Sequence, residues 1–119
     1  MTELFRLIKE EFSEKDQEQQ WTYECLFKLI INQKVITKTT ITDHPWRKKG
    51  REWITKELIL NIFKEKLNGE RREPIKKHGQ REAFVEEKIP YGDKDYLLVF
   101  WFENWNSDWI WVRNCYPVG

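Results

Sequence analysis

The sequence predicts an α+β fold in which helices pack on one antiparallel sheet. One observation is the order of the expected elements: two helices, a strand, a third helix and an antiparallel meander. A second is the aromatic content, since 7 Trp, 7 Phe and 4 Tyr supply a core although 34% of the residues are charged. The length of 119 residues indicates a single domain, 1–119, with an N-terminal helical pair at 1–33 and a sheet-containing core at 34–119.

Apolar residues at helical spacing predict the two N-terminal helices. Leu4, Ile8 and Phe12 stand at i, i+4 and i+8 within residues 3–14, and the other positions are mostly charged. Residues 21–31 form a second and more apolar segment of the same kind. The polar stretch between the two segments is expected to be a turn or a solvated continuation of the first helix.

The middle of the chain predicts a strand followed by a helix. Residues 35–42 are β-branched at nearly every position, which favours a strand. The strand is expected to end at Asp43-His44-Pro45, because proline disfavours helix at the residue before it. Thr55 is expected to cap a helix that runs through Leu67, and Asn68-Gly69 is its expected end.

The last third of the chain predicts an antiparallel meander. Residues 81–89 are the first strand, and the turn residues at 90–93 follow it. Residues 96–102 are apolar on both faces, so this strand should lie inside the sheet. A hairpin loop at 103–108 joins it to the last strand at 109–116.

Charge is concentrated in the middle of the chain, although the net charge is only +1. Residues 47–81 carry 12 basic and 5 acidic side chains, whereas both flanking segments are net acidic. Such a segment attracts phosphate backbones, and simple solvation of a helix and a loop is the alternative. The predicted nucleic-acid-binding residues are Arg47, Lys48, Lys49, Arg51, Arg71, Arg72, Lys76, Lys77 and, in the last hairpin, Trp105.

Several classes of protein are excluded or disfavoured by the sequence. It has no run of about 18 apolar residues, which a membrane-spanning helix needs. It has no zinc-type spacing, acidic calcium loop or glycine-rich phosphate loop, so no metal and no cofactor are expected. The charged start is unlike a signal peptide, and Cys25 and Cys115 are expected to be buried thiols. These features favour a cytoplasmic protein without membrane contact.

His44 is the first candidate catalytic residue. It stands where the predicted strand ends, and a basic run begins three residues later at Arg47. Its ordinary pKa near 6.5 suits proton transfer at neutral pH. Metal-free RNA cleavage needs a base for the 2′-hydroxyl and positive charge for the phosphate. The alternative role of His44 is a hydrogen bond that caps the loop.

Arg113 is the second candidate. It lies in an otherwise apolar strand, so it is expected to reach solvent or to bind an anion such as a phosphate. Arg81 opens the first strand of the meander and is expected to join it. Stacking of Arg113 on a tryptophan ring is the alternative.

Two motifs suggest a family. They are Ile41-Thr42-Asp43-His44-Pro45 with a following helix, and a meander that ends in Arg113-Asn114-Cys115-Tyr116-Pro117. With them, the stretch from Lys34 to Pro117 resembles the small barnase–RelE-like ribonuclease superfamily, which includes RelE-type toxins, the colicin D tRNase and phage nuclease domains. The resemblance implies that His44 is the base, that Arg81 and Arg113 bind phosphate, and that Tyr116 donates a proton.

The expected function is a metal-independent endoribonuclease-like domain of a toxin–antitoxin or phage system. Its expected partners are RNA and a protein inhibitor. The alternative is a non-catalytic protein-interaction module that uses the acidic N-terminal helix and the aromatic hairpin. Convergence separates the two hypotheses: an enzyme brings His44, Arg81 and Arg113 into one cleft, whereas an interaction module leaves them scattered.

Overall fold

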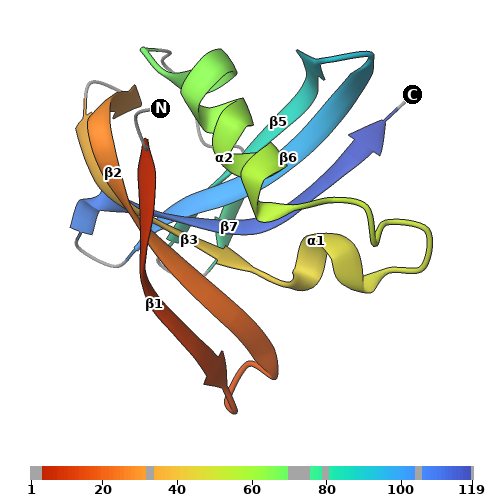
Figure 1. The fold of residues 1–119 in the computed structure, drawn as a ribbon, viewed down its shortest axis with the longest axis horizontal. Helices are drawn as coiled ribbons and strands as arrows, with labels where there is room; N and C mark the ends of the chain where they lie inside the picture. Colours follow the sequence, from red (N-terminus) through yellow and green to blue (C-terminus); the bar gives the residue numbers. More distant parts are fainter. Residues whose placement is uncertain (1–3, 32–33, 70–75, 79–80, 104–105, 119) are drawn as a thin grey trace.

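The computed structural model describes residues 4–31, 34–69, 76–78, 81–103 and 106–118. Strands dominate this part of the chain, and they form one sheet with short helices (Figure 1). The strands are β1 (Phe5–Ser13), β2 (Glu18–Ile31), β3 (Lys34–Thr42), β4 (Lys76–His78), β5 (Arg81–Tyr91), β6 (Lys94–Glu103) and β7 (Asn106–Val118). The helices are α1 (His44–Arg47), α2 (Lys56–Ile62) and a π-helical turn, η1 (Phe63–Leu67), that continues α2.

The predicted α+β fold with two N-terminal helices is wrong, because both segments are strands. β1 and β2 form a long antiparallel hairpin, which pairs Phe5 with Cys25 at one end and Ser13 with Glu18 at the other. The polar stretch between the two segments was expected to be a turn or a continuation of the first helix. Residues 14–17 form the turn, and the residues from Glu18 onward begin β2. The interaction-module hypothesis loses its acidic helix with this correction.

A spacing of four residues explains the error. Residues at i, i+4 and i+8 lie on one face of a helix, but they also lie on one face of a strand, whose side chains alternate with period two. In the sequence Leu4, Ile8 and Phe12 fit both patterns, although β1 itself begins at Phe5 and a bulge leaves Ile8 outside its register with β2. In β2 every second residue is apolar or aromatic, namely Trp21, Tyr23, Cys25, Phe27, Leu29 and Ile31. This continuous alternation is the strand signal that the helical assignment missed.

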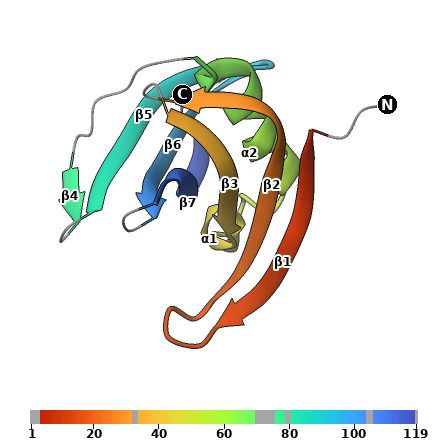
Figure 2. The same ribbon diagram turned by 90° about the vertical axis from the view of Figure 1, so that its left-hand side faces the viewer.

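The sheet has the order β1-β2-β3-β7-β6-β5-β4, and Figure 2 shows its strong curvature between the two edge strands. All neighbours are antiparallel except β3 and β7, which run parallel. The predicted strand at 35–42 and the pairing of 96–102 with 109–115 are confirmed, and β6 is an interior strand as expected. The parallel contact joins two segments that are about 70 residues apart, as the pairing of Thr40 with Trp111 shows.

The predicted helix after Thr55 is confirmed together with its ends. The Thr55 hydroxyl oxygen accepts a hydrogen bond from the Leu58 N–H at 3.1 Å, which satisfies one of the free donors of the first turn. Asn68 follows the last turn in an extended conformation, and Gly69 adopts a positive φ of 86°. Few residues other than glycine adopt that conformation without strain, so Asn68-Gly69 ends the helical segment as predicted.

The two faces of the sheet have different chemistry. One face packs against α2 and η1, where the rings of Phe63 and Phe100 meet edge to face at 5.4 Å. The opposite face carries polar and aromatic side chains at alternate positions of β2, β3 and β7. We call it the Thr–Trp face, and it is defined by Gln20, Thr22, Thr40, Thr42, Trp109 and Trp111.

Two further sequence expectations concern the membrane and the thiols. Within the described ranges, no helix is long and apolar enough to cross a membrane. Cys115 is fully buried, and burial raises the pKa of its thiol to about 12. Cys25 is only partly buried, and the same effect raises its pKa to about 11. Both cysteines are free thiols.

Candidate functional site

Three charged or titratable side chains from distant parts of the chain meet at the end of the Thr–Trp face. Glu18 Oε2 lies 3.0 Å from His44 Nε2 and 3.5 Å from Arg113 Nη1. The other carboxylate oxygen, Glu18 Oε1, accepts a hydrogen bond from Gln20 Nε2 at 2.9 Å. We call Glu18, His44 and Arg113 the Glu18 site. Two of its members are the strongest candidates from the sequence, and Glu18 was not among them.

Glu18 is the buried centre of this site. Only 5% of the residue is exposed, whereas the side chains of His44 and Arg113 are 25% and 45% exposed. A buried carboxylate loses its hydration, and it is tolerated only when charges and hydrogen bonds compensate for this loss. The imidazole and the guanidinium therefore cover a carboxylate from the solvent side. Side chains two residues apart on a strand point to the same face of the sheet, so Glu18 and Gln20 of β2 lie on one face.

A β-bulge in β7 occurs at Arg113, which alternation with Trp109 and Trp111 places on the Thr–Trp face. Val112 pairs with Phe100 and Asn114 pairs with Val99, so Arg113 is the extra residue between two successive pairs. The bulge also explains why Val112 and Cys115, three residues apart, are both fully buried on the helix side. Without the bulge, strict alternation would put one of them on the Thr–Trp face. Bulges commonly occur near active sites, where they redirect a side chain.

The short helix α1 holds His44 at the end of β3. Pro45 stands in its first turn, and the Asp43 N–H donates a hydrogen bond to the Gln19 carbonyl at 3.2 Å. Arg47 Nε lies 2.9 Å from Asp43 Oδ1, and Arg47 also donates to the Gln17 carbonyl. The Asp43 contact is a charge contact rather than an aligned hydrogen bond, since that oxygen lacks a partner of good geometry. These contacts fix α1 against the turn between β1 and β2.

The surroundings of His44 favour its neutral form. Burial lowers the pKa of His44 below 6.5, and the positive charges of Arg113 and Arg47 lower it further. The carboxylates of Glu18 and Asp43 act in the opposite direction without cancelling this effect. Because Nε2 faces a carboxylate, the proton of the neutral ring belongs on Nε2, and Nδ1 is left to accept a proton. The pair thus has the arrangement of an imidazole base oriented by a carboxylate.

The lowered pKa of His44 predicts a loss of stability in acid. Between the lowered pKa and 6.5, the unfolded chain binds more protons at His44 than the folded chain does. The free energy of unfolding should therefore fall as the pH falls through that interval. Urea denaturation at about pH 7.5 and about pH 5 measures the difference, and the His44→Asn protein should lose less stability than wild type between the two. An equal loss in both proteins would contradict the expected direction.

The backbone of Arg81, whose side chain lies outside the described residues, and the ring of Tyr116 both lie away from the Glu18 site. Arg81 is the first residue of β5, and β5 is three strand positions from β3, a separation of roughly 14 Å. Ala83 of β5 pairs with Trp101 of β6, and Trp101 pairs with Trp111 of β7. Arg81 precedes Ala83 and therefore lies farther than Trp111 from the level of Arg113. Tyr116 pairs with Leu97, and its ring lies under Arg51 at 4.2 Å. Of the three residues expected in one cleft, His44 and Arg113 are therefore brought together, and each contacts Glu18.

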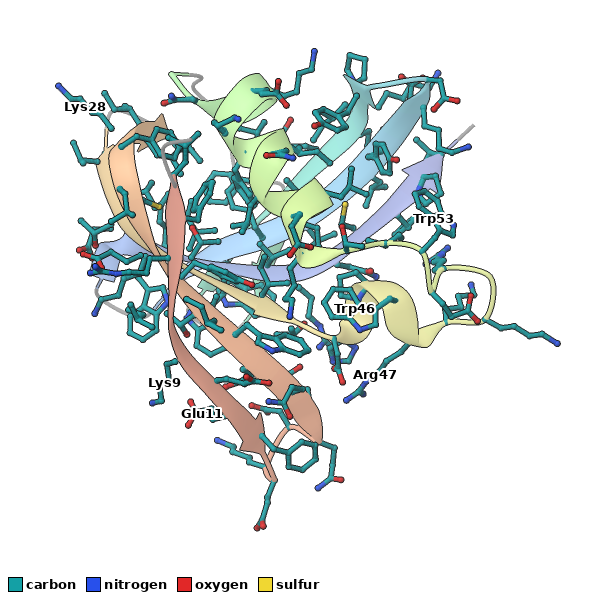
Figure 3. All side chains as sticks on the ribbon, viewed as in Figure 1. Lys9, Glu11, Lys28, Trp46, Arg47 and Trp53 are labelled. Atoms are coloured by element: carbon teal, nitrogen blue, oxygen red, sulfur yellow. The ribbon has the colours of Figure 1, made fainter. Side chains whose placement is uncertain are left out.

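The predicted nucleic-acid-binding residues fall into three groups. Arg47 is tied to Asp43 and the β1–β2 turn, and Figure 3 shows it beside Trp46 on α1. Lys48 and Lys49 are exposed after α1, and Arg51 covers Tyr116. The remaining residues lie outside the described part of the chain, completely for Arg71, Arg72 and Trp105 and in their side chains for Lys76 and Lys77 of β4. A continuous basic surface over 47–81 stays a prediction.

The site has no evident set of metal ligands. Over the ranges that the structure describes, no group of three or more His, Cys, Asp and Glu side chains is arranged to hold a metal ion. The contacts of the Glu18 site suit proton transfer at His44, charge stabilisation by Arg113, and orientation of both by Glu18.

Comparison with known proteins adds no family to this description. No protein-family model matches the chain, and neither a curated protein nor a solved structure shows significant similarity to it.

Proposed function

We propose that this protein is a metal-independent endoribonuclease-like domain whose catalytic centre is the Glu18 site. The observation that supports this proposal is the convergence of Glu18 from β2, His44 from α1 and Arg113 from the bulge of β7. Replacing a buried charge cluster by apolar residues is often neutral or stabilising. Such a cluster beside a titratable imidazole is therefore a candidate functional site rather than a device for stability.

The residues account for the steps of RNA transesterification. His44 Nδ1 accepts the proton of the 2′-hydroxyl, and the 2′-oxygen forms a bond to phosphorus. Arg113 stabilises the negative charge that develops on the phosphate oxygens. The bond from phosphorus to the 5′-oxygen breaks, and the leaving oxygen takes a proton from water. The products are a 2′,3′-cyclic phosphate and a free 5′-hydroxyl. Glu18 is a positioning residue, which orients the imidazole and stabilises the imidazolium that forms.

Cleavage of total RNA by the purified 119-residue chain tests this proposal. We expect fragments ending in 2′,3′-cyclic phosphate, with cleavage undiminished by EDTA, because protein side chains supply the proton transfer and the positive charge. Arg113→Ala should lower the rate by about 10²–10³-fold through lost charge stabilisation. Intact RNA at high protein concentration would overturn the proposal and favour the interaction module.

The Glu18→Gln protein tests the positioning role, with Glu11→Gln as a matched control. The control makes the same chemical change on exposed β1, where the Glu11 carboxylate pairs with Lys9. Glu18→Gln should slow cleavage on the order of 10²-fold or more, because the imidazolium loses its counter-charge. It should also move the acid limb of the pH–rate profile to lower pH, since the Glu18 charge raises the pKa of His44. A slower variant with an unshifted acid limb would show that Glu18 is only structural.

A further inference from the structure

The Thr–Trp face next to the Glu18 site carries aromatic and basic side chains that the proposed reaction does not require. Trp109, Trp111 and Arg113 follow one another at alternate positions of β7, and Arg113 belongs to the Glu18 site. Lys38 of β3 pairs with Trp109 at the far end of this row. From this arrangement we infer that the Thr–Trp face binds single-stranded RNA beside the cleaved phosphate. Bases would stack on Trp111 and Trp109, with Lys38 contacting the backbone. The inference rests on the proposed function for the location of that phosphate.

The two indole rings form a preorganised pair. Their centroids are 6.0 Å apart with an interplanar angle of 30°, so neighbouring rings present similarly oriented surfaces. Trp109 Nε1 donates a hydrogen bond of 2.8 Å to Thr40 Oγ1, and Thr40 is in turn 2.8 Å from Thr22 Oγ1. These bonds hold one edge of the Trp109 ring against the sheet. Both indoles are partly exposed, and stacking on a held ring costs a bound base little ordering of the protein.

The charges along the row complement a phosphate backbone. Lys38 Nζ lies over the face of the Trp109 ring, 4.9 Å from its centre, so a base that stacks on this face displaces the ammonium toward the RNA backbone. Arg113 supplies a second, half-exposed cation four residues along the strand, a separation of roughly 13 Å. Glu24 is opposite Lys38 in the sheet, but its carboxylate forms an ion pair with Arg6. Aromatic rings flanked by cations are typical of surfaces that bind single-stranded nucleic acid.

The expected ligand is a single strand because only an unpaired strand offers free base surfaces to a row of tryptophans. In an A-form duplex the bases are stacked on one another, and proteins contact mainly phosphates and 2′-hydroxyls. A duplex could therefore reach Lys38 and Arg113 but could not stack on Trp109 and Trp111. The Thr–Trp face should therefore bind single-stranded RNA more tightly than duplex RNA.

Equilibrium binding of an uncleavable oligonucleotide tests the inference. The probe is a fluorescent 2′-O-methyl RNA of about eight unpaired nucleotides, a length within the usual range for such surfaces. It lacks the 2′-hydroxyl nucleophile, so the wild-type chain binds it without cleavage. We expect Trp109→Leu and Trp111→Leu each to weaken binding by about 5- to 150-fold, and Trp111→Phe to retain most of the affinity. Lys38→Gln should reduce the salt dependence by about 0.7 in the slope of log K against log salt concentration.

Two controls make the result specific. Trp53→Leu removes an exposed indole that lies near Tyr96, away from the row, and should leave binding unchanged. The same oligonucleotide annealed to its complement should bind much more weakly than the single strand. Thermal midpoints of all variants establish that they are folded. Wild-type affinity in both leucine variants, an equal loss in Trp53→Leu, or equal binding of the duplex would each overturn the inference.

The binding and cleavage experiments fail independently. Tryptophan-dependent binding without cleavage of natural RNA would overturn the proposed function and leave the Thr–Trp face as an RNA-binding surface. Cleavage of natural RNA together with unchanged binding in the leucine variants would overturn the inference and leave the proposed function standing.

Discussion

The His44→Ala protein is expected to lose RNA cleavage by about 10²–10⁴-fold while it remains folded. The loss follows from the removal of the only group in the Glu18 site that can accept a proton while remaining partly exposed. The fold should survive because the Glu18 carboxylate keeps its contacts with Gln20 and Arg113. Initial rates on total RNA and the thermal midpoint of both proteins measure the two parts of this prediction.

A second variant keeps the experiment decisive if His44→Ala is unstable. His44→Gln retains a polar side chain that can donate to Glu18, so it should preserve the local contact. Glutamine does not act as a base, and the rate should fall as far as in the alanine protein. Cleavage at the wild-type rate in either folded variant would assign His44 a structural role. In wild type, the rate should decline only below pH 6.5, because the pKa of His44 is lowered.

Phe100→Ala should produce a large loss of stability. The Phe100 side chain is fully buried in β6, where it stacks on Phe84 at 5.1 Å and meets the edge of Phe63 at 5.4 Å. Truncation of a large aromatic side chain in a core costs about 3–5 kcal/mol, since it loses apolar burial and leaves a cavity. The midpoint of urea unfolding should fall accordingly, with the slope of the transition unchanged.

Phe12→Ala is the matched control for this prediction. Phe12 is 55% exposed on the edge strand β1, so the same truncation should change stability by about 0.5 kcal/mol or less. Similar midpoints for the two alanine variants would contradict the assignment of Phe100 to the core. Trp101 is also expected in the core from the two-sided apolarity of residues 96–102, but it lies on the opposite side of β6 from Phe100 and is only partly buried. A smaller effect is expected for Trp101→Ala.

Two of the three residues of the Glu18 site could be predicted one at a time from the sequence, and the third depended on the fold. His44 at a strand end and Arg113 in an apolar strand are each unusual for their surroundings, so the sequence identifies them without a structure. Glu18 stood in a polar stretch where a carboxylate is ordinary. The alternation of Gln20, Thr22 and Glu24 with Trp21, Tyr23 and Cys25 was the available signal, and Glu18 continues its polar side by two residues. This signal has meaning only once the segment is recognised as a strand.

Arg81 illustrates the opposite case. Its chemistry suits phosphate binding as well as that of Arg113, but its position in the sheet separates it from His44. Residue type predicts which chemistry is available, whereas proximity depends on strand order. The order of this sheet places β7 directly beside β3, and it leaves β6 and β5 farther away.

Local interactions made several elements predictable from the sequence by itself. The β-branched run at 35–42, the Thr55 cap and the two-sided apolarity of 96–102 each have a cause within a few residues of the chain. Only the tertiary structure decided the state of β1 and β2, because apolar residues four apart satisfy both helix and strand geometry. The pairing of β1 with β2, and of β2 with β3, selects the strand conformation over the helix. The Glu18 site was decided in the same way. The parallel contact of β3 with β7 brings Arg113 beside the end of β3, and the antiparallel contact of β2 with β3 adds Glu18. These pairings join residues as distant as 18 and 113, so no pattern within a few residues of the chain predicts them.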